Sequence, residues 1–222
     1  MPMAVESLGV IMREVVRRNR VRWGIVYLQI TRGVSRRDHA FPPAGTKPSI
    51  VVTARNLDAA NAERLAADGV AVISVPENRW ERVDIKSVSL LPNVLAKQTA
   101  REHGAREAWF VDKQGFVTEG SSSNAWIVTK NNTVVTRHVD HAILKGITRT
   151  VVLDIIAAQG LKLDVRPFTM DEAYAAKEAF ITSASQTVMP VVKIDGRPIG
   201  NGAPGLLSSA LRKDYYRHAE MS

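Results

Sequence analysis

The sequence predicts a mixed α/β fold, of the α+β kind, and three observations favour it. β-rich runs and amphipathic helical runs are interspersed along the 222 residues without a strict alternation of strand and helix. Apolar residues make up 45% of the chain and charged residues 23%, the composition of a globular protein with a substantial core. No internal repeat or low-complexity linker interrupts this pattern.

The N-terminal quarter is expected to form a helix, two strands and a second helix. Apolar residues at helical spacing predict a helix over 7–20. The runs "WGIVYLQIT" and "SIVVTA" predict strands over 23–31 and 49–54. Asp58 is a suitable N-cap for a helix that "DG" ends after residue 67.

The remainder is expected to form short strands and four further helices. Strands are expected at 70–75, 83–85, 107–112, 125–129, 133–136, 161–168, 178–184 and 187–196, the last bending at Pro190. Helices are expected at 91–104, 146–160, 171–177 and 205–219. Asn131 and Asn132 join two of the strands in a hairpin turn.

The net charge of +8 raises the question of a nucleic-acid partner. Only one dense basic cluster occurs, "REVVRRNRVR" at 13–22, and basic and acidic residues alternate elsewhere. No zinc-finger spacing, RNA-binding signature or basic patch interleaved with aromatic residues is present. The charge therefore favours anionic small molecules over nucleic acid.

The absence of cysteine excludes disulfides and cysteine metal sites, and no metal site is predicted. The N-terminal apolar run contains Glu6 and Arg13, so it does not read as a secretory signal. No stretch approaches the length needed to span a membrane. A cytoplasmic location is predicted.

Two stretches carry ionisable side chains in surroundings that read as buried. In "VDIKSVSLLPNVLAKQ", Lys86 follows a short strand and precedes a mainly apolar run. In "VTEGSSSN", Glu119 follows two β-branched residues, so its carboxylate would be partly buried and would need a cationic partner. A turn rich in small polar residues explains the second stretch equally well.

Two other stretches suit an anion. In "LKGITR", Gly146 begins a helix whose free N–H groups at Ile147 and Thr148 lie at the positive end of the helix dipole. In "FITSASQ", the hydroxyls at 182, 183 and 185 end a strand and could add donors. An ordinary helix start and strand end remain the alternatives.

The loop "SRRDHAFPP" places Arg37 and His39 two residues apart. In an extended segment these side chains point the same way, and together they would bind a carboxylate. On spacing alone, a solvated basic loop explains the pair at least as well.

Taken together, these parts are those of a pyridoxal phosphate site: a lysine, a carboxylate for the pyridine nitrogen and a helix start for the phosphate. The motifs "YLQITRG", "RDHAFP", "DIKSVSLLPNVLAKQ", "VTEGSSSN" and "GITR" occur in that order. The match extends to "PVVKIDGRPIGNGAPG". The whole chain resembles the class IV (fold type IV) aminotransferases, most closely the bacterial D-amino-acid aminotransferases.

The resemblance implies a role for each candidate cofactor residue. Lys86 matches the lysine that bonds covalently to the cofactor and is the catalytic acid and base, and Glu119 matches the carboxylate beside the pyridine nitrogen. Ile147 and Thr148 match the phosphate cradle. Ser183 and Ala184 match a further phosphate contact, to which Ala184 could offer only its backbone. Arg79 matches an arginine beside the cofactor.

The resemblance also implies substrate contacts and a division into two domains. Arg37 and His39 match a clamp on the substrate α-carboxylate that reaches across a homodimer interface, and Tyr27 matches a nearby tyrosine. Residues 1–60 would be the remainder of a small N-terminal domain and 61–222 the large cofactor-binding domain. Family members begin further upstream than Ser7, so the small domain is expected to be truncated.

The activity implied is ping-pong transfer of an amino group between a D-amino acid, of the D-alanine or D-glutamate type, and a 2-oxo acid. Three alternatives stay open: a branched-chain L-amino-acid aminotransferase, an aminodeoxychorismate lyase, and a truncated relative without catalytic activity. The Arg37/His39 pair beside "FPP" favours the D-amino-acid enzyme.

Overall fold

The computed structural model describes residues 2–221. The chain divides into two compact units, Met1–Asn61 and Ala62–Ser222. The first unit contains helix α1 (Val5–Arg18) and strands β1 (Gly24–Ile30) and β2 (Ile50–Asn56). The two strands pair antiparallel, from Gly24 opposite Asn56 to Ile30 opposite Ile50. α1 contacts β2, and its Leu8 is buried. The helix and both strands agree with the sequence-based prediction.

The loop between β1 and β2 carries the "SRRDHAFPP" motif. The backbone N–H of Thr31 donates to the carbonyl of Ser49 (2.9 Å) and so closes the loop. Gly33 has φ +102°, and a Cβ there would clash with the carbonyl oxygen of Lys47. Only glycine fits this crossing, which brings the two arms of the loop together. The Arg32 guanidinium stacks on the Phe41 ring 3.7 Å from its centroid.

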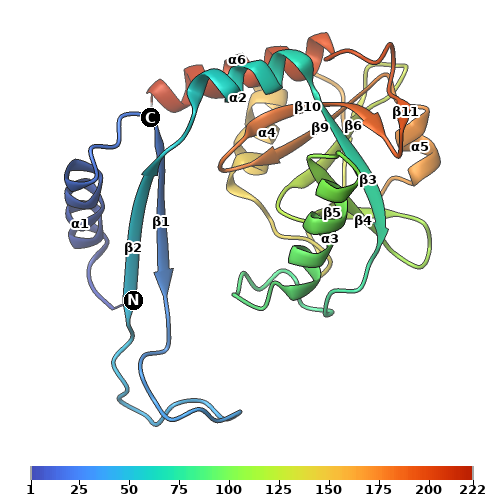
Figure 1. Cartoon of the computed structure of the whole chain (residues 1–222). Helices are drawn as coiled ribbons and strands as arrows, with labels where there is room; N and C mark the ends of the chain where they lie inside the picture. The colour runs from blue at the N-terminus through green and yellow to red at the C-terminus, as the bar shows by residue number, and fades with distance from the viewer. Residues whose placement is uncertain (1, 222) are drawn as a thin grey trace. The chain divides into compact units, whose positions relative to one another are not determined.

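The second unit is built on one large sheet, in which nine strands pair within the described part of the chain. Its strand order is β5-β4-β3-β10-β9-β6-β7-β8, and β11 pairs with β10. The strands are β3 (Val70–Pro76), β4 (Glu107–Val111), β5 (Val117–Gly120), β6 (Asn124–Val128), β7 (Val134–Thr136), β8 (Leu163–Val165), β9 (Glu178–Ser183), β10 (Thr187–Ile194) and β11 (Arg197–Pro198). The helices are α3 (Leu91–Glu102), α4 (Ile147–Ala158), α5 (Met170–Tyr174) and α6 (Leu206–Met221), while α2 (Ala59–Asp68) contains the boundary between the two units. Figure 1 shows the helices arranged around this sheet.

This sheet must be curled, because β5 is its edge strand whereas β6 lies five strand steps away in the order. Five steps in a flat sheet would separate them by about 24 Å. The chain from Gly120 to Asn124 can span only about 14 Å. The curl brings β5 and β6 into contact and places their ends side by side. This meeting point is where the candidate site forms.

Hydrophobic clusters cover both faces of the sheet. Neighbouring residues alternate between the clusters, as the period of two in a strand requires. Trp126, Phe180 and Val188 belong to the cluster under α4 and α6. Ile127, Ile181 and Met189, one residue later in each strand, belong to the cluster that includes Trp109 and Phe168.

Two details of the predicted strands are wrong. Residues 83–85 form no strand: Ile85 N–H donates to the carbonyl of Arg82 (3.1 Å) and Arg82 pairs with Asp84, which together stabilise a turn. β10 does not bend at Pro190, which pairs in register with Phe180. The irregularity follows it, between Val191 and Lys193. Val192 is the extra residue, as in a β-bulge.

Candidate active site

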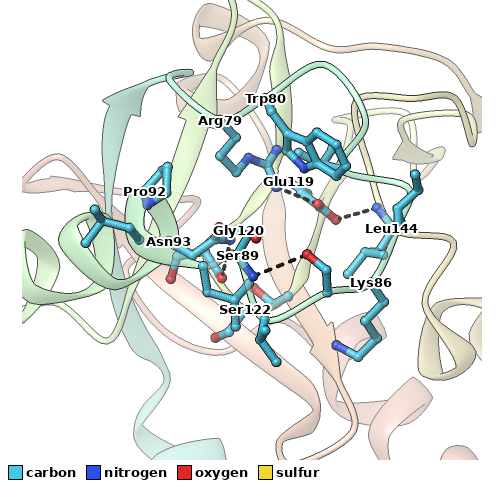
Figure 2. Close-up of a pocket in the computed structure, with 18 residues that line it drawn as sticks. Arg79, Trp80, Lys86, Ser89, Pro92, Asn93, Glu119, Gly120, Ser122 and Leu144 are labelled. Atoms are coloured by element: carbon cyan, nitrogen blue, oxygen red, sulfur yellow. Dashed lines mark hydrogen bonds and ion pairs between the residues drawn. The ribbon is translucent and has the colours of Figure 1, made fainter. Parts of the chain in front are cut away.

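A cavity of about 710 Å³ opens in the second unit at the meeting of β5, the segment before α3 and the loop after β5. Its lining includes Lys86, Arg79, Glu119 and Leu144, together with the serines at 121–123. Figure 2 shows these side chains around the cavity. The volume lies within the range of small-molecule sites. Lys86, Glu119 and Arg79, which lie up to 40 residues apart in sequence, are therefore brought to one cavity.

Glu119 is the best-defined ionisable group of the cavity. It lies in β5 and is 4% exposed. Arg79 Nη1 donates to Oε1 (2.7 Å), while Asn124 Nδ2 (3.0 Å) and the backbone N–H of Leu144 (3.1 Å) donate to Oε2. Figure 2 shows the carboxylate between Arg79 and Leu144. The cationic partner expected for a buried glutamate is thus present.

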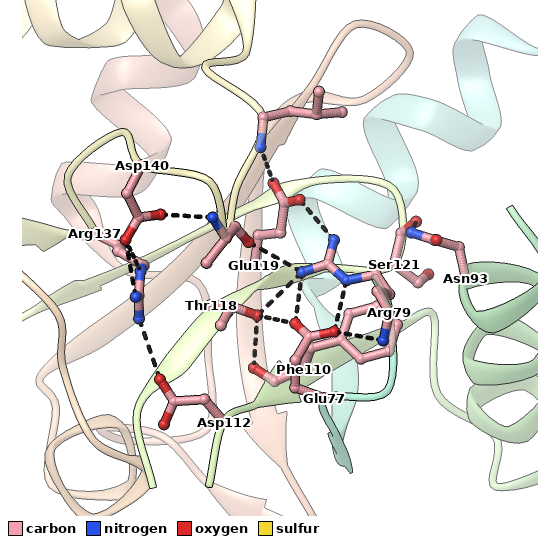
Figure 3. Close-up of polar contacts among 12 residues, drawn as sticks. Glu77, Arg79, Asn93, Phe110, Asp112, Thr118, Glu119, Ser121, Arg137 and Asp140 are labelled. Carbon is pink, nitrogen blue, oxygen red and sulfur yellow. Dashed lines mark hydrogen bonds and ion pairs between the residues drawn. The ribbon is translucent and has the colours of Figure 1, made fainter. Parts of the chain in front are cut away.

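Arg79 is shared between two carboxylates. Its Nε donates to Glu77 Oε1 (2.9 Å) and its Nη2 to Glu77 Oε2 (2.7 Å), in addition to the bond to Glu119. Nη2 also reaches the carbonyl of Ala142 (3.2 Å), and the guanidinium lies 4.4 Å from the centroid of the Phe110 ring. Figure 3 shows this cluster. Arg79 lines the cavity, but these contacts hold its guanidinium on the two carboxylates.

The unequal sharing affects the two acids differently. Burial raises the pKa of Glu119 to about 7, because its single bond to Arg79 and the N–H of Leu144 compensate only partly, and Glu77 adds a like charge. Burial acts on the pKa of Glu77 in the same direction, but two Arg79 bonds and the Thr118 hydroxyl (2.8 Å) hold that pKa below its ordinary value. The pKa of Glu119 therefore lies near neutral pH, above that of Glu77.

Replacing Arg79 with methionine is expected to raise the pKa of Glu119 further, since burial would then act without a cation beside it. A carboxyl group with a raised folded-state pKa adds stability at low pH, and that stability is lost as the pH rises through the folded pKa. The variant should therefore lose stability between pH 7 and 9, where the parent chain changes less. Urea denaturation at a series of pH values measures this, with Arg106→Met as a control for the loss of charge. Parallel pH profiles of the variant and the parent would contradict the assignment.

Lys86 lies at the cavity in an exposed segment. The expected burial of Lys86 is wrong for this chain, because the residues around it face outward as well. Ile85, Val88, Leu90 and Leu91 are between 46% and 70% exposed, so they provide no apolar cover. No hydrogen bond or ion pair joins the Lys86 ammonium to another of residues 2–221. The amine is accessible to a carbonyl compound that enters the cavity.

The helix start predicted to bind phosphate forms as expected. Gly146 is the N-cap of α4 with φ 65°, and the Gly146 carbonyl accepts the N–H of Thr150 (3.0 Å). Ile147 is 80% exposed, Thr148 is buried, and both follow Leu144 of the cavity wall closely. Ser183 ends β9 and Ala184 is exposed in the turn after it. None of these four residues lines the cavity itself.

The three residues expected to bind substrate belong to the first unit. Arg37 and His39 are exposed in the β1–β2 loop, and Arg37 has no hydrogen bond or ion pair within the described part of the chain. Tyr27 is 51% exposed on β1, and its hydroxyl donates to Gln29 Oε1 (3.0 Å). Arg37 is free to bind an external carboxylate.

The sequence did not indicate that Glu107 organises the serine loop after β5. Glu107 is fully buried and accepts hydroxyls from Ser121, from Ser122 (2.8 Å) and from Ser123 (3.0 Å). Burial opposes its ionisation, but Lys97 (3.2 Å) and the serines hold the pKa of Glu107 below its ordinary value. Glu107 precedes these serines by 14 to 16 residues, so only the fold brings it beneath the loop.

Comparison with known proteins places this geometry in a family. The family model for amino-transferase class IV matches residues 1–194. The D-alanine aminotransferase of Bacillus licheniformis is 44% identical over 197 residues, which cover 89% of this chain and 68% of that protein. The D-alanine aminotransferase of Staphylococcus aureus (strain MSSA476) is 37% identical over 218 residues, which cover 98% of this chain and 76% of that protein.

Solved structures give the same fold. The T.th. branched-chain amino acid aminotransferase with pyridoxamine 5'-phosphate has a TM-score of 0.85 and 30% identity. The match covers 98% of this chain and 72% of that enzyme. The branched-chain aminotransferase of Thermoproteus uzoniensis with norvaline has a TM-score of 0.79 and 28% identity. The match covers 97% of this chain and 71% of that enzyme. The chain belongs to the class IV aminotransferases and has their fold type IV architecture. It is an aminotransferase of a family whose cofactor is pyridoxal phosphate.

The residues of the cavity fit this cofactor. A buried carboxylate whose pKa lies near 7 can share a proton with a pyridine nitrogen. An accessible amine in the same cavity can bond to an aldehyde. Gly146 lets the start of α4 approach Asn124 beside this carboxylate, since a Cβ there would clash with Asn124 Oδ1. Among residues 2–221, no helix is both long and apolar enough to cross a membrane.

Proposed function

We propose that this chain transfers the amino group of a D-amino acid, of the D-alanine or D-glutamate type, to a 2-oxo acid. The observation that carries the proposal is the presence of Lys86 and buried Glu119 in one cavity. The D-alanine aminotransferases among its relatives support the choice of substrate, as does the Arg37/His39 pair in the loop of the first unit.

Lys86 is the proposed acid and base. When bound, pyridoxal phosphate supplies an electron sink that weakens the bond between Cα and its hydrogen in the substrate. Lys86 Nζ would hold the cofactor until the substrate amine displaces it. The freed amine would then take the proton from the substrate Cα and return it to C4′ of the cofactor. Glu119 holds the proton of the pyridine nitrogen, and Arg79 keeps Glu119 in place through the 2.7 Å bond.

The phosphate is proposed to lie at the start of α4, with Ile147 and Thr148 offering backbone N–H groups. Ser183 and Ala184 offer further donors at the end of β9. Two features support this placement: Leu144 of the cavity wall precedes the helix by only three residues, and helix N-termini favour anions.

Arg37, His39 and Tyr27 are proposed to bind the substrate α-carboxylate. Arg37 presents a planar fork that can pair with both carboxylate oxygens, and His39 adds a donor. We propose further that the active form is a homodimer, in which this loop completes the site of a second copy. The units Met1–Asn61 and Ala62–Ser222 are proposed to be the small domain and the cofactor-binding domain. A cytoplasmic location is part of the same proposal.

Substitution of Arg37 by lysine is expected to be costly, because lysine keeps the charge but loses the two-point contact. Losing one charged hydrogen bond should cost about 1.5–3 kcal/mol. The Michaelis constants for D-alanine and D-glutamate should rise by similar factors, since both carry the α-carboxylate. Steady-state kinetics with the two donors measures this, with Arg36→Lys as the neighbouring control. A loss confined to D-glutamate would make Arg37 a reader of the side chain.

A branched-chain L-amino-acid aminotransferase is the second candidate, and the similarity to solved enzymes of that name favours it. The test compares D-alanine with L-leucine as amino donors to 2-oxoglutarate. The proposal expects 2-oxo acid from D-alanine only. Transfer from L-leucine alone would favour the second candidate, and pyruvate formed from aminodeoxychorismate would favour a lyase. If cofactor binds but no amino group moves, the chain is a relative without catalytic activity.

A further inference from the structure

The side-chain amide of Asn124 joins two parts of the site, the Glu119 carboxylate and the segment before α4. It is the first residue of β6 and is 5% exposed. Its Nδ2 donates to Glu119 Oε2 (3.0 Å) and to the carbonyl of Leu144 (2.9 Å). An amide nitrogen has two hydrogens, so both are engaged. The side chain thus links the carboxylate of β5 to the segment that leads into α4.

The other side of the amide lies against the start of α4. A Cβ on Gly146 would lie far inside van der Waals contact of Asn124 Oδ1. Gly146 also has φ +65°, where other residues are strained. The helix start can therefore approach Asn124 this closely only because residue 146 is glycine.

The backbone of Asn124 makes a third connection. It pairs with Thr182 in the antiparallel ladder between β6 and β9, next to Ser183 at the end of β9. Three segments that are separated in the sequence therefore meet at one buried residue. They are the segments that carry Glu119, Ile147 and Ser183.

We propose that Asn124 is a positioning residue that couples the two ends of the cofactor site. It holds the Glu119 carboxylate and the start of α4 at a fixed separation, so that the pyridine nitrogen and the phosphate of one cofactor molecule can be bound at the same time. This inference depends on the proposed roles of Glu119 and of the α4 start. Aspartate in its place would have no amide hydrogens and would set two carboxylates side by side, whereas alanine would remove both bonds.

The test compares pyridoxal phosphate with pyridoxal, which lacks the phosphate. Dissociation constants for both are measured from the visible absorbance of the lysine-bound compound in the parent chain. The dissociation constant of pyridoxal divided by that of pyridoxal phosphate reports how much the phosphate contributes to binding. In Asn124→Ala this ratio should fall by about tenfold or more, since a displaced helix start no longer suits the phosphate. The pH midpoint of the absorbance should shift as well, since Glu119 loses a donor.

Two further variants separate positioning from general stability. Gly146→Ala pushes on the same contact from the opposite side and should lower the ratio in the same way. Thr136→Val is the matched control: Thr136 is buried, and its hydroxyl donates to the carbonyl of Ala125, the residue after Asn124 (3.0 Å), but it has no bond to Glu119 or Leu144. It should lower the melting temperature and leave the ratio unchanged.

The outcomes distinguish this inference from the proposed function. If the parent chain binds neither compound at Lys86, the proposed function fails and the inference fails with it. If the parent binds both, but folded Asn124→Ala keeps the parental ratio and pH midpoint, only the inference is overturned. If Asn124→Ala does not fold, Gly146→Ala decides: a parental ratio in that variant overturns the inference.

Discussion

Replacement of Lys86 by alanine is expected to abolish amino transfer and the visible absorbance of bound cofactor. Lys86 is the lysine of the cavity lining, and its amine has no competing partner in the described part of the chain. Without it, no amine is placed to bond to the cofactor aldehyde or to carry the Cα proton. Activity should fall below detection with D-alanine and 2-oxoglutarate, and the absorbance spectrum of the cofactor-loaded protein should be that of free pyridoxal phosphate.

Lys145→Ala is the control for this prediction. Lys145 is exposed and follows Leu144 of the cavity wall, so its removal tests a nearby positive charge without touching the proposed chemistry. The control should retain the absorbance band and most of the activity. Loss of the band in Lys145→Ala, with the band retained in Lys86→Ala, would reverse the assignment.

Replacement of Glu119 by glutamine is expected to reduce turnover on the order of 100- to 1,000-fold, as for other losses of a preorganised electrostatic contact. A neutral amide cannot stabilise a protonated pyridine nitrogen, so the cofactor becomes a weaker electron sink. Cofactor affinity should change much less, because the proposed phosphate contacts and Lys86 remain. Rapid-mixing kinetics of the first half-reaction with D-alanine measures the effect.

The fold should tolerate this change. Glutamine has the shape of protonated glutamate, and burial raises the pKa of Glu119 to about 7, so the parent carries the neutral form in part near neutral pH. Arg79 keeps its paired bonds to Glu77 in the variant. Glu81→Gln, a change at an exposed neighbouring acid, is the control and should leave turnover intact. A parental rate in Glu119→Gln would rule out its role at the pyridine nitrogen.

Much of the fold could be predicted because local signals determine it. The glycine before 147 and the apolar spacing after it mark α4, and the proline at 92 with the glycine at 104 brackets α3. Glu119 could be singled out because it follows Val117 and Thr118 in a strand, where a carboxylate needs a partner. That partner, Arg79, is 40 residues away in sequence.

The rest depends on long-range pairing that a single sequence does not reveal. The curl of the sheet sets β5 beside β6 and so joins Glu119 to Asn124, but no local pattern encodes it. In the sequence, Glu107 has the pattern of an ordinary strand residue, and only the fold brings the serine hydroxyls to its carboxylate. The apolar run after Lys86 predicted burial, yet burial requires a covering surface, and the described residues supply none there. A short segment with β-branched residues, such as Val83 and Ile85, likewise forms no strand without a neighbour to pair with.

The central claim is that Lys86 is the lysine that holds pyridoxal phosphate in the cavity beside Glu119. Borohydride reduction of the cofactor-loaded chain, followed by proteolysis and mass spectrometry, tests it most directly, because reduction makes the bond between lysine and cofactor permanent. The account predicts one modified peptide, with the label on Lys86 and none on Lys97 or Lys145. A label on either of those lysines with Lys86 unmodified would contradict it.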